Sequence, residues 1–266
     1  MGKTRIDWAD YSINPVRGLC PMDCKDNQGK PYCYARRMYK RFHWNPEIRY
    51  DDWVWQTGGH IPAGSKIFIG STIELFHDKT IQYLPTIMEY VECLKSRTFI
   101  FLTKCPQNLP KKFPDNCWVG VSATNTMKFQ KGTACLSDIA ATKRFVSLEP
   151  LLDWNMSTNT MYGYLVQRGI HWLIVGQCTP ISAKTAPKIE WIREIVEAAD
   201  KADIPVFLKN NLQSLLPQER PFYTKPCADI NGQDPCYQEP CLSDKSAEEC
   251  STAPNYFKLR QELPRV

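Results

Sequence analysis

The feature that most constrains the fold is a regular alternation of short apolar runs with longer amphipathic segments. The runs are rich in β-branched and aromatic residues, and each is followed by polar or small residues, as expected for strands buried on both faces. With an N-terminal strand near residues 12–16, the pattern predicts about seven strands. The others lie at residues 66–70, 98–103, 117–122, 144–148, 171–176 and 204–209.

Amphipathic helices fit between several of these runs. Residues 79–95 and 187–202 carry apolar side chains at steps of three and four, the spacing of one helical face. Pro85 lies inside the first segment, where it either kinks the helix or marks a later start. Strand, crossover helix and parallel strand, repeated over about 200 residues, predict a parallel α/β fold. Periodicity alone leaves open a doubly wound sheet and a full or partial (β/α) barrel.

Polar and charged residues follow nearly every predicted strand. In either architecture the carboxyl ends of the strands form the working face. Any one of these residues is ordinarily a turn former or a helix cap, but their concentration on one rim favours a binding site. They are Ser71, Thr72, Glu74, Lys104, Ser122, Asn125, Glu149, Gln177, Cys178, Lys209, Asn210 and Asn211.

Composition narrows the class of protein. A chain of 266 residues can form one large domain or two small ones. It has no run of 18 apolar residues and no apolar signal core at its N-terminus, so we expect a cytoplasmic protein without a membrane partner. Twelve cysteines then point to metal or redox chemistry rather than to structural disulfides. The net charge of +5 is compatible with a nucleic-acid partner without requiring one.

Three of the cysteines, Cys20, Cys24 and Cys33, lie in one predicted loop after the first strand. Three thiolates can hold three irons of a cubane 4Fe-4S cluster and leave the fourth iron open for a ligand such as S-adenosylmethionine. The alternative is a zinc knuckle, for which His43 would supply a fourth ligand. Spacing alone does not decide between the two.

The loop resembles the signature of radical S-adenosylmethionine enzymes. Their three cysteines follow the first barrel strand, and an aromatic residue directly precedes the third. Cys20 and Cys24, with three residues between them, match the first half of that signature, and Tyr32 with Cys33 matches the second. The chain departs from it by placing eight residues between Cys24 and Cys33 where the usual signature has two. We interpret the excess as a loop excursion through residues 26–29, a turn-forming sequence.

A second resemblance covers residues 6–212 and 257–264. It is to a family of phage-borne and bacterial proteins, described as phage proteins or domains of unknown function, that carry radical-SAM-like cysteines. The resemblance implies a full or partial (β/α) TIM-type barrel of six to seven strands over residues 1–212. The Cys-rich segment at residues 213–256 is an insertion that is not part of the family pattern, and we expect a tail at 257–266 to pack back on the barrel. The matching blocks are residues 12–18, 32–35, 74–77, 102–106, 120–122, 147–152 and 172–176.

The resemblance implies roles for single residues in holding the cofactor. Cys20, Cys24 and Cys33 would ligate the cluster, and Tyr32 would lie against the cluster or the adenine. The remaining assignments are Ser71, Thr72 and Glu74 for the methionine amino group, Lys104 for its carboxylate, Ser122 and Asn125 for the ribose hydroxyls, and Gly176 for close approach of the backbone to the adenine.

Two further residues are candidates for catalysis. Glu149 would bond the ribose or act on the substrate, and Cys178 would donate a hydrogen atom. Structural alternatives remain for both. Glu149, like Glu74, can form a salt bridge with a neighbouring Lys or Arg, and Cys178 can be a buried, inert thiol.

A second group of cysteines lies near the C-terminus. Cys227, Cys236, Cys241 and Cys250 occur in a polar segment with almost no apolar neighbours, so a core does not account for them. A second 4Fe-4S cluster, a structural zinc site and two disulfides are the alternatives, in that order of preference.

The function that the resemblance implies is reductive cleavage of S-adenosylmethionine to a 5′-deoxyadenosyl radical, which abstracts hydrogen from a macromolecule. An electron-donor protein would be a partner. Residues 36–44 interleave cations with aromatic side chains, as a surface that binds RNA or a single strand does, but an amphipathic helix with a solvated basic face has the same pattern and is the slightly preferred interpretation. A peptide or protein substrate, a non-catalytic zinc-stapled nucleic-acid-binding protein and an electron-shuttling protein are the alternatives.

Overall fold

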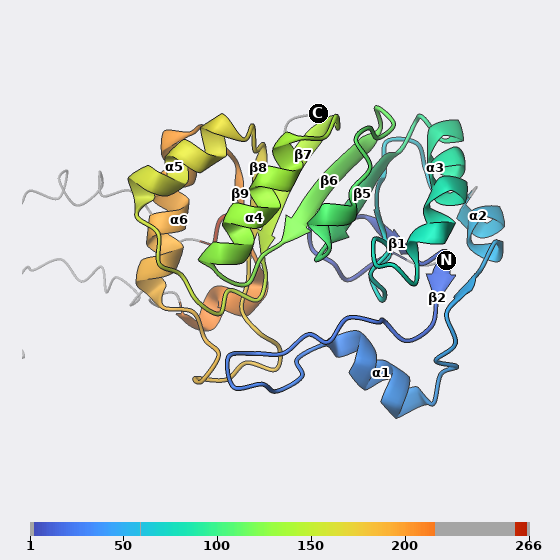
Figure 1. Cartoon of the computed structure of the whole chain (residues 1–266), viewed down its shortest axis with the longest axis horizontal. Helices are drawn as coiled ribbons and strands as arrows, with labels where there is room; N and C mark the ends of the chain where they lie inside the picture. The colour runs from blue at the N-terminus through green and yellow to red at the C-terminus, as the bar shows by residue number, and fades with distance from the viewer. Residues whose placement is uncertain (1–2, 59, 216–258, 265–266) are drawn as a thin grey trace, which may run out of the picture.

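Seven parallel strands, hydrogen-bonded in the order in which they occur in the chain, form one curled sheet in the computed structural model (Figure 1). The structure describes residues 3–58, 60–215 and 259–264. The strands are β1 (Tyr11–Ile13), β4 (Lys66–Ile69), β5 (Thr98–Thr103), β6 (Cys117–Ser122), β7 (Lys143–Leu148), β8 (Trp172–Val175) and β9 (Val206–Leu208). A doubly wound sheet reverses its strand order, whereas this one does not. The prediction of a partial (β/α) barrel is therefore confirmed.

Helices cover the convex face of the sheet. In Figure 1, α4 lies across β6 and β7, and α5 packs beside α6 at one end. The helices of this layer are α3 (Leu84–Cys93), α4 (Thr126–Ser137), α5 (Thr158–Gln167) and α6 (Ile189–Lys201). Pro85 lies in the first turn of α3, so it marks a later start than residue 79 and not a kink.

Shorter elements surround this framework. The predicted strand at residues 12–16 is two strands, because the chain leaves the sheet after Ile13, and β2 pairs antiparallel with β3 in a separate ribbon. In Figure 1, α1 lies beneath the strands. The elements are β2 (Val16–Arg17), α1 (Tyr34–Phe42), β3 (Arg49–Tyr50), α2 (Trp53–Gly58) and the 3-10 turns η1 (Ile81–Tyr83), η2 (Pro106–Asn108) and η3 (Asn210–Leu215).

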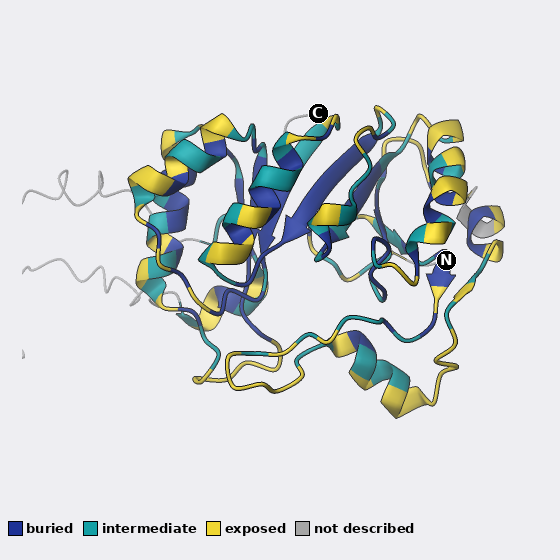
Figure 2. Ribbon diagram, in the orientation of Figure 1, coloured by how far each residue is buried: buried dark blue, intermediate teal, exposed yellow. Residues whose placement is uncertain are grey.

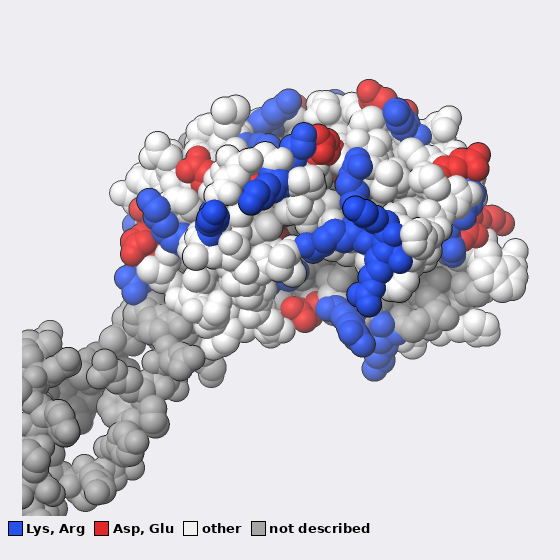
Figure 3. Space-filling model, turned by 90° about the horizontal axis from the view of Figure 1, so that it is seen from below, with Lys and Arg blue, Asp and Glu red and all other residues white. Residues whose placement is uncertain are grey.

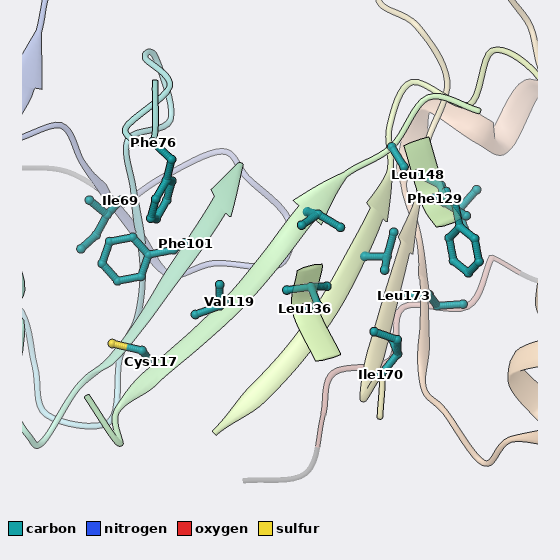
Figure 4. Close-up of a cluster of buried hydrophobic side chains, with 14 of the residues drawn as sticks. Ile69, Phe76, Phe101, Cys117, Val119, Phe129, Leu136, Leu148, Ile170 and Leu173 are labelled. Atoms are coloured by element: carbon teal, nitrogen blue, oxygen red, sulfur yellow. The ribbon is translucent and has the colours of Figure 1, made fainter. Parts of the chain in front are cut away.

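Both faces of the sheet are buried (Figure 2). On β5, for example, Phe99 and Phe101 face the helices, and Ile100 faces the inside of the half barrel. Successive side chains of a strand point to opposite faces, so a strand that is apolar at every position must be covered twice. Figure 4 shows the helix-side core, which contains Leu136 of α4 and Val119 of β6.

The inner face changes character along the strands. The layer toward the amino ends of the strands is aromatic and closely packed, and the rings of Phe145 and Trp172 lie 5.2 Å apart. The next inward positions are small: a Cβ on Gly120 would lie 2.4 Å from the Phe145 ring, and Ser147 follows Phe145 on β7. Small side chains above an aromatic layer leave room inside the half barrel, toward the carboxyl ends of the strands.

Residues near the C-terminus return to β9, the last strand of the sheet. The backbone N–H of Leu208 donates to Arg260 O (2.7 Å), and that of Glu262 donates to Val206 O (3.1 Å). These bonds satisfy main-chain groups along one edge of the sheet. The predicted C-terminal metal ligands Cys227, Cys236, Cys241 and Cys250 lie outside the described residues. Within the described ranges, no helix is long and apolar enough to cross a membrane.

Candidate functional site

A cavity of about 370 Å³ opens at the carboxyl ends of the strands. Trp8, Phe68 and Leu102 form its apolar floor, and the loop before α1 forms one wall. Most of the predicted site residues meet here, whereas Asn125 and Gly176 are not among the lining residues. The predicted residues that line the cavity are Cys20, Cys24, Tyr32, Cys33, Ser71, Thr72, Glu74, Lys104, Ser122, Glu149, Gln177, Cys178 and Lys209.

The loop that carries the three cysteines is closed by hydrogen bonds at the base of its excursion. The backbone N–H of Tyr32 donates to Cys24 O (3.2 Å), and Lys25 forms an antiparallel bridge with Pro31. The Asp26 carboxylate accepts from the N–H groups of the turn that follows it. The extra residues therefore leave and rejoin the loop at neighbouring points, so Cys24 lies beside the Tyr32–Cys33 pair.

Contacts to the rest of the fold hold this loop in place. The Arg36 guanidinium, on α1, donates to Cys20 O and to Met22 O, both at 3.0 Å. From the tip of the excursion, Asn27 Nδ2 donates to Leu152 O (2.7 Å), which lies beyond β7. The loop is thus attached on both sides of the cavity.

The three thiols are free and lie in a partly apolar environment. Burial raises the pKa of Cys20, although hydrogen bonds from the backbone N–H groups of Met22 and Glu74 oppose this effect. Burial also raises the pKa of Cys24, and the positive charge of Lys104 acts in the opposite direction. Without a metal these two thiols are protonated at neutral pH. Metal binding by Cys20 and Cys24 would therefore release protons.

Within the described ranges, no group of three or more His, Cys, Asp or Glu side chains is arranged around a single metal ion. His43, the fourth ligand of the alternative zinc site, does not line the cavity. It ends α1 in the left-handed conformation with φ 50°, and its side chain is exposed. The structure therefore does not bring together the four ligands that a zinc knuckle requires.

Glu74 joins the ends of β4 and β5. Its carboxylate accepts from Thr103 Oγ1 (2.6 Å), from the Lys104 backbone N–H (2.8 Å) and from that of Phe76 (3.1 Å). Its own N–H points to Cys20 Sγ at 3.4 Å. The residue is 7% exposed, so its charge is stabilised by these three donors and not by water. Glu74 lines the cavity but also holds its wall together.

Ser71 and Thr72 belong to a network around Asn14. Asn14 Oδ1 accepts from the Thr72 backbone N–H and from Thr72 Oγ1, both at 3.1 Å. Ser71 Oγ accepts from Ser12 Oγ at 2.8 Å and from Asn14 Nδ2 at 3.1 Å. The Tyr34 hydroxyl donates to the Ser71 carbonyl oxygen. This network holds the segment after β4 against β1 and α1.

An ion pair lies at the opposite side of the cavity. Lys209 Nζ, after β9, is 2.5 Å from Glu149 Oε1, after β7. Gly176, after the intervening strand β8, has no side chain, and a Cβ there would lie 3.1 Å from both Glu149 Cγ and Lys209 Cδ. Gly176 thus makes room for the pair, while Ser122 Oγ donates to the Glu149 carbonyl oxygen (3.3 Å).

Two further predicted rim residues follow β8. Gln177 is 1% exposed; its Nε2 donates to the Asn211 carbonyl oxygen and to Ser214 Oγ, but its Oε1 has no partner among the described residues. A buried acceptor without a donor is costly unless a ligand or water supplies one. Cys178 lines the same part of the cavity, and burial raises the pKa of its thiol.

Asn125 has a different role. Its side chain accepts from the Lys128 backbone N–H (2.9 Å) and caps the first turn of α4. Asn is among the preferred N-cap residues because its oxygen satisfies an otherwise free helical N–H.

Comparison with known protein families shows which family the chain belongs to. A family model described as a protein of unknown function, DUF5131, matches residues 3–216. The chain belongs to the DUF5131 family. The matched range contains the whole sheet and every residue that lines the cavity. Searches of curated proteins and of solved structures found no match to this DUF5131 protein.

The sequence-based site lacks several residues of the DUF5131 cavity region, and three of them have roles that the structure makes clear. Asn14 connects the segment after β4 to β1, Tyr34 bonds to the Ser71 carbonyl oxygen, and Trp8 forms part of the floor. Asn14 follows the first strand, and its position on the rim was a usable signal. Nothing local to the sequence indicated that Trp8, which precedes that strand, would enter the half barrel.

Proposed function

We propose that this chain is a radical S-adenosylmethionine enzyme acting on a macromolecular substrate. Cys20, Cys24 and Cys33 would hold a 4Fe-4S cluster in the cavity. The observation that carries the proposal is the hydrogen bond from Tyr32 N to Cys24 O. It closes the excursion, so the three thiols are presented by one compact loop at the mouth of a partial (β/α) barrel.

The chemistry of the donors fits such a cluster. Three free thiols line one cavity, and His43, the fourth ligand of the alternative zinc site, is not among the residues that line it. Three thiolates with one open position are what a cluster that also binds a substrate-like cofactor requires. The cavity volume of about 370 Å³ lies in the range of small-molecule sites.

The bound cluster with S-adenosylmethionine would supply one-electron cleavage of the cofactor to a 5′-deoxyadenosyl radical. The chain's own residues bind, orient and exclude water. Lys104 places a positive charge near Cys24, which favours the thiolate form needed for ligation. Trp8, Phe68 and Leu102 close the floor against water. Gln177 Oε1 offers a buried acceptor for a donor group of the ligand.

The test is anaerobic. The protein is reconstituted with iron and sulfide, reduced with dithionite and incubated with S-adenosylmethionine, and 5′-deoxyadenosine is measured by chromatography. We expect product from the wild type and none from Cys33→Ala. Cys93→Ala removes an exposed thiol on α3 that is not among the residues lining the cavity, and this variant should form as much product as the wild type.

A readout other than activity accompanies this assay. Cys33→Ala should bind about four fewer irons per chain than Cys93→Ala, with a matching loss of absorption near 400 nm. Full product formation by Cys33→Ala, or wild-type protein that holds zinc and forms no product, would overturn the proposal.

A further inference from the structure

A second cavity, of about 420 Å³, adjoins the first. The two share one lining residue, Thr72, which belongs to the segment after β4. The second cavity lies between the strands β1, β2 and β3 and the end of α1. Its side chains combine arginine, amide and aromatic groups, and the ones that matter here are Arg17, Arg49, Asn45, Tyr39 and Trp44.

The aromatic side chains at this cavity form a fixed surface. The ring of Trp44 lies 5.3 Å from that of Tyr39, edge to face, and 5.5 Å from that of Phe42, stacked. Tyr39 is itself held, because its hydroxyl accepts from the Gly18 N–H at 2.8 Å. Trp44 is 43% exposed and Phe42 52% exposed. Exposed flat rings that do not need to reorganise are suited to stacking with planar groups.

The reversal of the chain after α1 creates this arrangement. His43 has a positive φ of 50°, and the Trp44 N–H then donates back to Tyr39 O (3.3 Å). The indole therefore folds back against Tyr39 of the helix that precedes it, and it remains 43% exposed.

The adjoining helix is strongly basic. α1 contains Arg36, Arg37, Lys40 and Arg41 and has no acidic residue. Arg36 and Arg37 hydrogen-bond to backbone carbonyls, whereas Lys40 and Arg41 are exposed and form no ion pair with any described residue. Figure 3, which views the molecule from the side where α1 lies in Figure 1, shows Lys and Arg gathered on this face with few acidic groups among them.

We propose that this second cavity and the exposed side of α1 bind a single-stranded nucleic acid. A base would stack on Trp44, and the adjacent phosphates would lie along Lys40 and Arg41. An acidic peptide would use the cations but would leave the exposed rings without a role. Because Thr72 lies between the two cavities, the next nucleotide along the strand would reach the first cavity. This last step rests on the proposed function, whereas the binding itself does not.

The experiment is a titration of labelled 12-nucleotide single strands, RNA and DNA in separate arms, with the full-length protein and no cofactor. Fluorescence anisotropy reports binding. Lys40→Glu/Arg41→Glu should weaken binding by more than about tenfold. It should also reduce the slope of log K against log salt concentration by about 1.4 in magnitude, the value for two phosphate contacts on a single strand. The control Lys95→Glu/Lys131→Glu makes the same change in net charge at two exposed residues, one in the turn after α3 and one on α4, and should weaken binding by less than about threefold.

The stacking component is tested at Trp44. Trp44→Ala should weaken binding by about tenfold or more, and Trp44→Phe should retain most of it. Circular dichroism identifies any variant that fails to fold. If Trp44→Ala does not fold, Trp44→Leu is compared with Trp44→Phe in its place.

Three results would overturn the inference: equal weakening by the two double variants, no loss with Trp44→Ala, or binding of polyglutamate that matches binding of the single strand. Failure of the two proposals is separable. A protein that binds single strands through these residues but forms no 5′-deoxyadenosine contradicts only the enzyme proposal. A protein that forms 5′-deoxyadenosine but binds no strand contradicts only this inference.

Discussion

Lys209 and Glu149 form an ion pair of 2.5 Å across the end of an intervening strand. They follow β9 and β7, which are both neighbours of β8 in the sheet. The contact is possible because the residue after β8 on the same face is Gly176. Three residues that are far apart in the sequence thus produce one charged element of the cavity wall.

We predict that this pair stabilises the fold cooperatively. The two side chains are 22% and 25% exposed, so the pair is mostly shielded from water. Lys209→Met leaves the carboxylate without its counter-ion and should cost about 1–2 kcal/mol, between the values for exposed and buried pairs. The double variant Glu149→Gln/Lys209→Met should cost less than the sum of the single variants in urea unfolding. Additive losses would mean that the two charges do not interact.

Glu74→Gln should destabilise the protein by about 1.5–3 kcal/mol. The side-chain amide nitrogen would replace a carboxylate oxygen that accepts a hydrogen bond, so two donors would face each other. All three partners of Glu74 are donors, so neither orientation of the amide satisfies them. Glu92→Gln, an exposed position on α3, serves as the control and should change stability by less than about 0.5 kcal/mol. The urea midpoints of the two variants decide the question; equal midpoints would contradict the structural role of Glu74.

A pair of glycine substitutions tests the packing of the inner face. Gly120→Ala would place its Cβ 2.4 Å from the Phe145 ring, which is fully buried, and overpacking of this kind costs about 1–3 kcal/mol. Gly163→Ala, inside α5, meets nothing within 4 Å and should stabilise the protein by about 0.5–1 kcal/mol. The midpoint of thermal unfolding should fall for Gly120→Ala and rise for Gly163→Ala. A stabilising effect of Gly120→Ala would contradict close packing of the inner face around the Phe145 ring.

Because of His171, we predict that the protein loses stability in mild acid. Burial lowers the pKa of its imidazole, and the positive charges of Arg144 and Lys143 lower it further. The unfolded chain takes up this proton below about pH 6.5, whereas the folded chain takes it up only at lower pH. Protonation therefore favours unfolding, and stability falls as the pH decreases through this window.

His171→Asn keeps an acceptor for the Arg144 N–H and removes the titration. The drop in urea midpoint between pH 7.5 and 5.5 should be smaller for His171→Asn than for the wild type. His60→Asn, at an exposed position, should show the wild-type drop. If His171→Asn lost as much stability as the wild type, other groups would account for the pH dependence.

The secondary structure was largely predictable because its signals are local. The apolar runs at residues 98–103 and 117–122 coincide with β5 and β6, since a strand buried on both faces must be apolar throughout. Boundaries were less predictable where contacts between distant segments decide them. The strand expected at residues 12–16 divides after Ile13, because the residues beyond it pair with β3 and not with β4.

The amino-acid sequence by itself determined the parallel α/β class, the rim on which polar residues gather and the positions of the three cysteines, because each follows from periodicity or spacing along the chain. Only the tertiary structure decided that the sheet keeps its chain order and curls, that the excursion closes at Tyr32 and Cys24, and that Thr72 lies between two cavities. These features depend on which segments meet in space. Hydrogen bonds and packing between residues distant in sequence set that outcome, and a local pattern does not encode it.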